Sequence, residues 1–275
     1  MHSPTVVTER AAFRSLAADA PPGARLPVEL RIAVADPFTA YRRARDGPGG
    51  VFFETTGGQP GWGYFAVEPI ERLTVNPEAA IADTERAAGG DNQRETPSLA
   101  ALAGLLDGET LVRGDCEVPY PCGAFGWLSY DIARELETLD GDAVDDRGLP
   151  RLQVAVYDCV AAWPEPHEDD PELRITCCPR IPEDADADAL DDIYETAVER
   201  ASSLARAARG GDPDIGGPPV DVADAAFSGD TSEAAFADRV RQVKASIRDG
   251  DTFQTNLSQR LTAPAAVHPV AAYDA

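Results

Sequence analysis

Polar side chains alternate along residues 252–261 with a spacing that could build one wall of a ligand cavity. They are Gln254, Asn256, Ser258 and Arg260, and the positions between them are mostly apolar. Two-residue spacing puts side chains on one face of a strand. Amides and a guanidinium on such a face can bind a carboxylate-bearing ligand in a polar cavity. A solvated strand face explains the same pattern, and the spacing does not decide between the two.

Other catalytic or metal-binding constellations are scarce. No histidine has a serine or cysteine neighbour in a recognisable nucleophile context. Gly57-Gly58 and Gly123-x-x-Gly126 lack the lysine and the spacing of phosphate loops, so we expect such glycines to let strands pack closely. The cysteines form no C-x-x-C pair, and we predict small buried side chains instead of a disulfide framework or a zinc site; they are Cys116, Cys122, Cys159, Cys177 and Cys178. We therefore assign no catalytic residue and no metal ligand.

The charge balance excludes whole classes of partner. Forty-eight acidic residues face 24 basic ones, for a formal net charge of −24. Such a surface repels nucleic acid and anionic membranes, which bind clustered cations. Because the acids are spread along the whole chain, we interpret them as adaptation to a cytoplasm of high salt, where screening weakens self-repulsion. No apolar run is long enough to cross a bilayer and no signal peptide is visible, so we expect a cytoplasmic protein.

Strand and helix patterns alternate without the regular rhythm of stacked strand–helix–strand units. Asp36 reads as a helix N-cap with Pro37 at the first helical position. Strands are predicted at 28–34, 51–55, 62–67 and 123–130, with a hairpin of 152–163 and 173–177. Helices are predicted from Pro37 to about 46, and at 97–108, 131–139 and 187–208. This mixture predicts an α+β fold with antiparallel sheets.

A second region begins after a glycine-, proline- and aspartate-rich stretch. We predict domains at 1–210 and 225–275, with 211–224 as the linker. Asp230 and Glu233 resemble a capping box, and Gly250 stands where a left-handed cap ends a helix. An apolar stripe at helical spacing lies between them; it consists of Phe236, Val240, Val243 and Ile247. A strand over 252–261 and a helix from His268-Pro269 follow.

Three stretches together resemble one enzyme family. Residues 250–260, Gly-Asp-Thr-Phe-Gln-Thr-Asn-Leu-Ser-Gln-Arg, resemble the segment that opens the chorismate-binding domain of the component I family of anthranilate and aminodeoxychorismate synthases. Residues 123–131, Gly-Ala-Phe-Gly-Trp-Leu-Ser-Tyr-Asp, resemble that family's Gly-x-x-Gly-[Tyr/Phe]-x-x-Tyr-Asp segment. Residues 52–55, Phe-Phe-Glu-Thr, resemble its amino-terminal Leu-Leu-Glu-Ser element.

The resemblance implies an antiparallel β-sandwich flanked by helices, present here as a truncated form. It implies a parent enzyme that binds chorismate with Mg²⁺ and receives ammonia from a glutamine amidotransferase subunit. It also implies an amino-acid pocket of the tryptophan type, at Thr55, Gln59, Pro60, Gly61 and Trp62. The family's usual arginine in that turn is Gly61 here. The family's magnesium-binding glutamates and catalytic histidine lie downstream of the Gln-Arg strand, so we expect this chain alone to be inactive.

Two enzymes and one binding role remain open. Because residues 52–55 differ from Leu-Leu-Glu-Ser and the arginine is absent, we favour aminodeoxychorismate synthase component I, in folate biosynthesis. The alternative is anthranilate synthase component I, in tryptophan biosynthesis. An alternative of another class is a non-catalytic module that binds an amino acid or docks a subunit.

Overall fold

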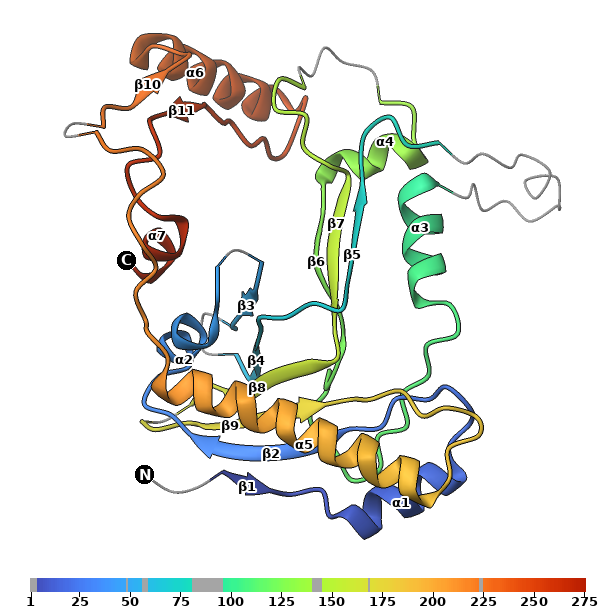
Figure 1. The fold of residues 1–275 in the computed structure, drawn as a ribbon. Helices are drawn as coiled ribbons and strands as arrows, with labels where there is room; N and C mark the ends of the chain where they lie inside the picture. The colour runs from blue at the N-terminus through green and yellow to red at the C-terminus, as the bar shows by residue number, and fades with distance from the viewer. Residues whose placement is uncertain are drawn as a thin grey trace, which may run out of the picture. The chain divides into compact units, whose positions relative to one another are not determined.

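The computed structural model describes residues 4–47, 49–55, 59–80, 96–139, 145–167, 169–222 and 225–275. The chain divides into unit 1, residues 1–213, and unit 2, residues 214–275 (Figure 1). The described part of unit 1 contains two antiparallel sheets and several helices, and unit 2 contains one long helix with short flanking elements. No helix in the described ranges is both long enough and apolar enough to cross a membrane.

The larger sheet of unit 1 has six strands, each antiparallel to its neighbours. Across the sheet they are β1 (Thr5–Val6), β2 (Val28–Ala33), β9 (Glu172–Cys177), β8 (Cys159–Glu165), β4 (Gly61–Ala66) and β3 (Val51–Phe53). The alternation predicted for β2 is confirmed, because Val28, Leu30 and Ile32 are buried in the core. The intervening Glu29 and Arg31 form an ion pair of 2.7 Å.

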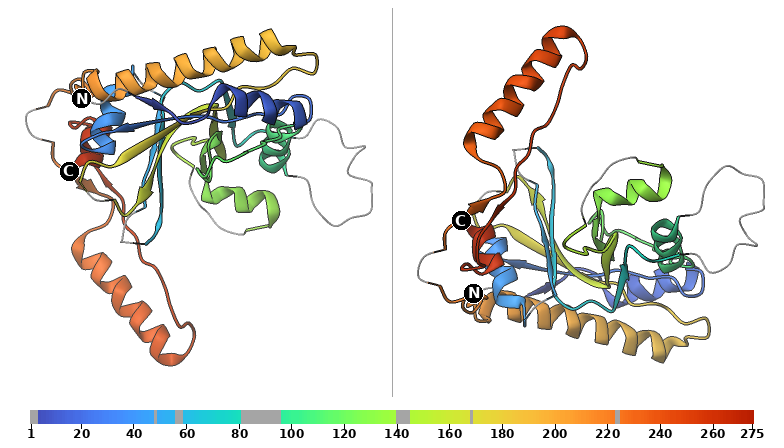
Figure 2. Two further views of the ribbon diagram at one scale, coloured as in Figure 1. Left: turned by 90° about the horizontal axis from the view of Figure 1, so that it is seen from below. Right: turned by 90° about the horizontal axis from the view of Figure 1, so that it is seen from above.

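Three helices pack with one face of this sheet. The long helix α5 (Ala187–Gly210) crosses β2 and β9, and α1 (Arg10–Asp19) and α2 (Pro37–Ala44) contact α5 (Figures 1 and 2). The main core lies here and includes Phe13, Leu30, Phe65, Trp163 and Leu204. The predicted start of α2 is confirmed, since the Asp36 carboxylate accepts from the Thr39 amide at 2.6 Å.

The smaller sheet of unit 1 contains β5 (Glu71–Val75), β7 (Leu152–Tyr157) and β6 (Gly123–Leu128), in that order. Helix α3 (Pro97–Leu106), capped by Thr96, packs Leu102 and Leu105 onto its buried residues. After β6 the predicted helix at 131–139 is much shorter. A 3₁₀ turn, η2 (Tyr130–Ile132), precedes α4 (Ala133–Leu136), which ends where Glu137 takes up extended backbone angles.

The single strand predicted at 152–163 is wrong. The chain breaks at Asp158, with β7 in the smaller sheet and β8 in the larger one, where β8 forms the predicted hairpin with β9. The apolar pattern continues across the break because the residues on both sides are buried. Periodicity therefore gives no sign that the chain changes sheets.

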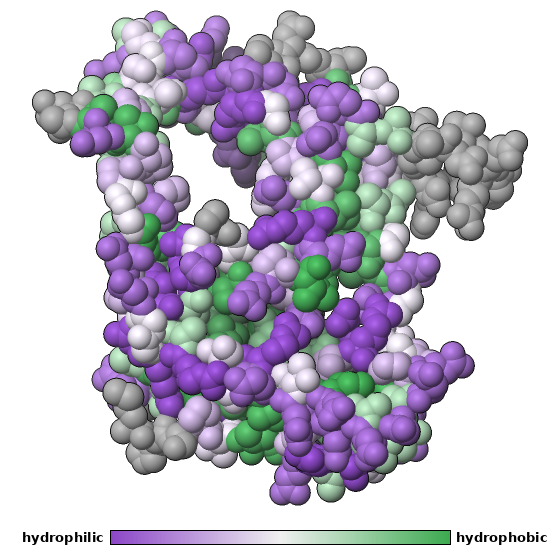
Figure 3. All heavy atoms as spheres, in the orientation of Figure 1, coloured by the Kyte–Doolittle hydropathy of each residue, from purple (hydrophilic) through white to green (hydrophobic). Residues whose placement is uncertain are grey.

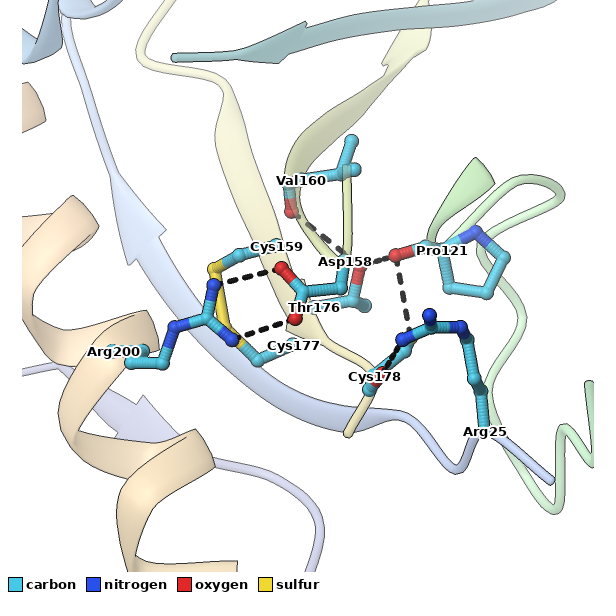
Figure 4. The surroundings of a disulfide bond; sticks show 9 residues. All are labelled: Arg25, Pro121, Asp158, Cys159, Val160, Thr176, Cys177, Cys178 and Arg200. Atoms are coloured by element: carbon cyan, nitrogen blue, oxygen red, sulfur yellow. Dashed lines mark hydrogen bonds and ion pairs between the residues drawn. A yellow bond between two sulfur atoms is a disulfide. The ribbon is translucent and has the colours of Figure 1, made fainter. Parts of the chain in front are cut away.

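The prediction that the cysteines form no disulfide is also wrong. Cys159 on β8 lies directly opposite Cys177 on β9, and the two sulfurs are bonded (Figure 4). Hairpin register brings them together, and register cannot be read from the 18-residue sequence separation. Cys116, Cys122 and Cys178 are free thiols.

Unit 2 is built around α6 (Glu233–Asp249). Gly250 adopts the predicted left-handed cap, with φ of 83°. The predicted capping box of Asp230 and Glu233 is wrong, because Ser232 is the N-cap and its hydroxyl accepts from the Ala235 amide at 3.2 Å. The apolar stripe of α6 is only partly covered by the described residues of the chain, and its Ile247 is 42% exposed.

The strand predicted at 252–261 is wrong over most of its length. Only β11 (Leu261–Thr262) forms, paired with β10 (Ser228–Gly229). A strand needs a neighbour to satisfy its backbone donors and acceptors, and among the described residues 252–260 have none. The predicted helix start at His268 is confirmed by α7 (Pro269–Asp274), where the His268 ring nitrogen accepts from the Val270 amide.

The mixture of helices and antiparallel sheets confirms the α+β class, while the β-sandwich stays a prediction.

Hydrophilic side chains are spread over much of the surface drawn in Figure 3, with hydrophobic side chains between them. This distribution matches the dispersed acidity of the sequence.

Candidate functional site

The turn between β3 and β4 brings two of the five predicted pocket residues together. Thr55 follows β3 and Gly61 begins β4. A Cβ atom built on Gly61 would lie 2.6 Å from the Thr55 hydroxyl oxygen. The hydroxyl therefore lies directly against a bare stretch of backbone, and a larger residue at position 61, such as the family's arginine, would have to displace it.

Trp62 belongs to the opposite face of β4. Successive side chains of a strand point to opposite faces, so Gly61 and Gly63 share one face. That face lies against the main core, because Gly63 contacts the buried Trp163. The half-buried Trp62 packs instead with the second core cluster. Its ring lies beneath the Arg174 guanidinium, 5.4 Å from the ring centroid.

The two remaining residues of the predicted pocket, Gln59 and Pro60, are exposed. The structure thus splits the five residues, with Thr55 against Gly61 and the Trp62 ring on the other side of the strand. Any ligand held by the hydroxyl of Thr55 would reach the Gly61 face of β4 and not the Trp62 ring.

The second predicted set does not share a strand face. Gln254, Asn256, Ser258 and Arg260 are all exposed and lie in a segment without regular secondary structure. Alternation along the sequence aligns side chains only when the backbone is extended and paired. The polar cavity strand is therefore not formed in this chain.

The segment from Gly123 to Asp131 is ordered by close backbone contacts. A Cβ on Gly126 would lie 2.1 Å from the Gln153 carbonyl oxygen and 2.6 Å from the Val154 Cα on β7. The prediction that this glycine serves strand packing is confirmed. Beyond β6, the Ser129 hydroxyl accepts from the Asp131 amide at 3.2 Å and starts the 3₁₀ turn.

A buried carboxylate fixes the next helix, and sequence reasoning missed it. The side chain of Glu135 on α4 is 1% exposed and forms an ion pair with Arg151 at 3.0 Å. It also accepts from the amide and the hydroxyl of Ser98 at 3.0 and 2.7 Å. Burial by itself raises the pKa of Glu135, but hydrogen bonds from Ser98, Arg151 and Thr96 outweigh it and lower the pKa below its ordinary value. Nothing in the local pattern singles out this glutamate among 48 acidic residues.

The chain matches the model of a known protein family. The family model described as chorismate binding enzyme matches residues 51–275, which include the β3–β4 turn, the Gly126 segment and all of unit 2. The chain belongs to the chorismate-binding enzyme family. The resemblance stated from the three sequence motifs is thus confirmed.

Relatives within the chorismate-binding family differ in how much of this chain they match. Two proteins of Haloarcula marismortui, named anthranilate synthase component 1 1 and component 1 3, are 55% and 53% identical over 98% of this chain. Aminodeoxychorismate synthase component 1 of Bacillus subtilis is 29% identical over 55% of it. The chain covers 52% and 50% of the two Haloarcula proteins and 30% of the Bacillus one. It therefore spans about half the length of the two Haloarcula relatives.

The described residues offer no cluster of ligands for the magnesium ion that the resemblance implies. In the described ranges, no three or more histidine, cysteine, aspartate or glutamate side chains are placed to hold a metal. The buried Glu135 already accepts three hydrogen bonds, two from Ser98 and one from Arg151. The residues described here therefore do not fit a metal site, and no catalytic role is assigned to them.

Proposed function

We propose that this chain is the amino-terminal part of an anthranilate synthase component I. The observation that carries the proposal is the 55% identity over 98% of the chain to a Haloarcula protein of that name. The aminodeoxychorismate synthase matches only 55% of the chain at 29% identity. Identity spread over the whole chain outweighs the few residues, Phe52 to Thr55 and Gly61, on which the sequence preference for aminodeoxychorismate synthase rested.

In this proposal the parent enzyme aminates chorismate with ammonia supplied by a glutamine amidotransferase subunit, in the presence of Mg²⁺. Residues 1–210 are the amino-terminal region and 225–275 the beginning of the chorismate-binding domain. The half-covered stripe of α6, with Phe236 and Ile247, supports this division, because an amphipathic helix needs a partner along its apolar face. The chain itself supplies the scaffold and no catalytic residue.

A split-enzyme assay tests the proposal. This chain is co-expressed with the part of the Haloarcula component 1 1 protein that it does not match. Purified protein is then given chorismate, ammonium and Mg²⁺ at high potassium chloride, and anthranilate is followed by its fluorescence. We expect anthranilate from the pair and none from either part alone.

Two controls make a negative result decisive. The Haloarcula protein split at the corresponding position reports whether splitting itself is tolerated. The corresponding part of the Bacillus aminodeoxychorismate synthase tests the other enzyme. If the split Haloarcula protein is active but this chain cannot replace its matching part, the proposal fails. Rescue by the Bacillus part alone would favour the aminodeoxychorismate alternative.

A further inference from the structure

A cleft in unit 1 has a thiol in its wall. It has a volume of about 160 Å³ and lies where the segment after α3 meets the ends of β5, β6 and β7. Aliphatic side chains such as Ile70 and Leu105 form much of its lining, and Arg25, Glu109 and Cys122 form a polar side. An apolar cavity of ~150 Å³ accommodates benzene, so this cleft has ample room for a small oxidant.

Cys122 has a second thiol as its immediate partner. It is half-buried at the cleft, and the thiol of Cys178, which is fully buried just beyond the end of β9, is the group that most lowers its pKa. The Cys178 sulfur also lies 3.4 Å from the Pro121 carbonyl oxygen (Figure 4). A thiol has one proton to donate. When Cys122 ionises, the Cys178 proton turns from the carbonyl to the thiolate.

The surroundings of Cys122 lower the pKa of its thiol. The hydrogen bond from Cys178 is the largest influence and lowers the pKa of Cys122; burial opposes it, and the positive charge of Arg25 adds to it. Asp158 and Glu109, the second of which is paired with Arg25 at 2.8 Å, act in the opposite direction. Because the thiolate is the reactive form of cysteine, Cys122 is primed for attack on an electrophile in the cleft.

Cys116 provides the contrast within the same molecule. It is six residues from Cys122 and also half-buried. Burial is the largest influence on it and raises the pKa of its thiol. The two thiols thus share a similar exposure but differ in the leading influence on the pKa, which is burial at Cys116 and the hydrogen bond from Cys178 at Cys122.

We propose that Cys122 is an oxidation site for small peroxides and that Cys178 is its resolving thiol. The Cys122 thiolate attacks one oxygen of hydrogen peroxide, the O–O bond breaks, and hydroxide leaves while the sulfur becomes sulfenic acid. The Cys178 sulfur then attacks the sulfenic sulfur; an S–S bond forms, and the sulfenic oxygen leaves as water with the Cys178 proton. Peroxide is reduced by two electrons and the two thiols are oxidised by two.

The product joins the two sheets of unit 1. Cys122 directly precedes β6 of the smaller sheet, and Cys178 directly follows β9 of the larger one. The existing Cys159–Cys177 bond is separate, because Cys177 is buried in the main core while its neighbour Cys178 contacts the Pro121 carbonyl. Oxidation would close the wall of the cleft and tie the start of β6 in place.

Peptide mapping of the full chain tests this inference. The non-reduced protein is treated with one equivalent of hydrogen peroxide, its remaining thiols are alkylated, and it is digested with trypsin and Glu-C. Cleavage after Glu117 separates Cys116 from Cys122, and Cys178 lies in the peptide 175–180 together with Cys177, whose bond to Cys159 already joins that peptide to the Cys159 peptide. We expect peroxide to cross-link the Cys122 peptide to the two peptides that the Cys159–Cys177 bond already joins, with Cys116 still alkylated.

Variants assign the roles. Cys178→Ser should abolish the cross-link and leave a Cys122 sulfenic acid that dimedone traps, whereas Cys116→Ser should behave as the wild type. If Cys178→Ser does not fold, competitive alkylation of the wild type at pH 7 replaces it, and Cys122 should react roughly tenfold faster than Cys116. Equal rates, preferential oxidation of Cys116, or absence of the cross-link would overturn the proposal.

Discussion

Both carboxylate oxygens of Asp158 accept hydrogen bonds from the Arg200 guanidinium, each at 2.7 Å (Figure 4). Asp158 stands at the break between β7 and β8, and its carbonyl also accepts from the Cys178 amide at 2.7 Å. The pair connects the point where the chain changes sheets to the middle of α5. Hydrogen bonding to Asp158 is the leading cause that raises the pKa of Arg200.

Asp158→Asn should therefore destabilise unit 1. Asp158 is 7% exposed, so its loss leaves a partly buried guanidinium without its counter-ion. Because the Arg200 side chain is 37% exposed and solvent screens part of the charge, we expect a loss of about 2 kcal/mol in the free energy of unfolding. Denaturant unfolding measures it, and Arg206→Ala, which removes an exposed pair with Glu199, is the matched control. Similar losses in both variants would contradict a special role for Asp158.

Glu135 predicts a pH dependence of stability. Its pKa is lower in the folded chain than the ordinary value of 4.5, so the ionised form stabilises the fold above that value. The contribution should vanish as the pH falls through the folded pKa. Glu135→Gln should thus lower the free energy of unfolding by roughly 2 kcal/mol at pH 7 and converge with the wild type at acid pH. Urea unfolding from pH 3 to pH 7 shows this, with Glu137→Gln at an exposed neighbour as the control. A difference that is independent of pH would count against the mechanism.

Alanine substitutions at Gly126 and Gly104 should change the stability of the fold in opposite directions. An alanine at 126 would push its methyl group into the backbone of β7 at Gln153, and we expect a loss of about 2–3 kcal/mol. Gly104 lies within α3, and a Cβ added there would meet no atom within 4 Å outside its own helical turns, so Gly104→Ala should stabilise by about 0.5–1 kcal/mol. Thermal unfolding of the two variants against the wild type separates the effects. Loss of stability in both would show that α3 cannot tolerate the change, and no loss at 126 would refute the strand-packing role.

Local signals predicted several features of both units. The Asp36 cap, the alternation of β2, and the glycine at 250 depend on residues within a few positions of each other, so the sequence displays them directly. The β7–β8 break, the Cys159–Cys177 bond and the Glu135 network depend on pairing between distant segments. No local pattern reports such pairings.

The candidate site shows the same division. The resemblance placed Thr55 and Gly61 in one pocket, and the structure brings these two residues together, while the pocket itself stays a prediction. The placement of Trp62 on the other face follows from strand alternation, which a list of pocket residues does not take into account. The prediction of a polar strand face at 254–260 is wrong, because alternation aligns side chains only in a paired strand. Among the described residues no neighbouring strand pairs with this segment.

Salt should stabilise the chain. A net charge of −24 makes the folded state repel itself, and counter-ions at high concentration screen that repulsion. We expect the midpoint of thermal unfolding to rise by roughly 5 °C or more between 0.1 and 2 M potassium chloride, which corresponds to at least ~1–2 kcal/mol. Sucrose at equal osmolality is the uncharged control. A midpoint that does not move, or one that rises equally in sucrose, would contradict screening as the cause.

Amino-acid binding should depend on Thr55 and not on Trp62. The resemblance implies a pocket of the tryptophan type at the β3–β4 turn, and the structure leaves the Thr55 hydroxyl against the bare backbone of Gly61. A hydrogen bond from a hydroxyl to a charged ligand group contributes about 1.5 kcal/mol. Calorimetry of the chain with L-tryptophan should therefore show roughly tenfold weaker binding for Thr55→Val. Trp62→Leu should bind as the wild type does, because its ring packs beneath Arg174 on the opposite face of β4. Thr74→Val, an exposed position on β5, controls for the substitution itself. Loss of binding in Trp62→Leu with none in Thr55→Val would show that the ligand uses the other face of the strand. If the wild type gives no heat of binding, this chain has no tryptophan pocket.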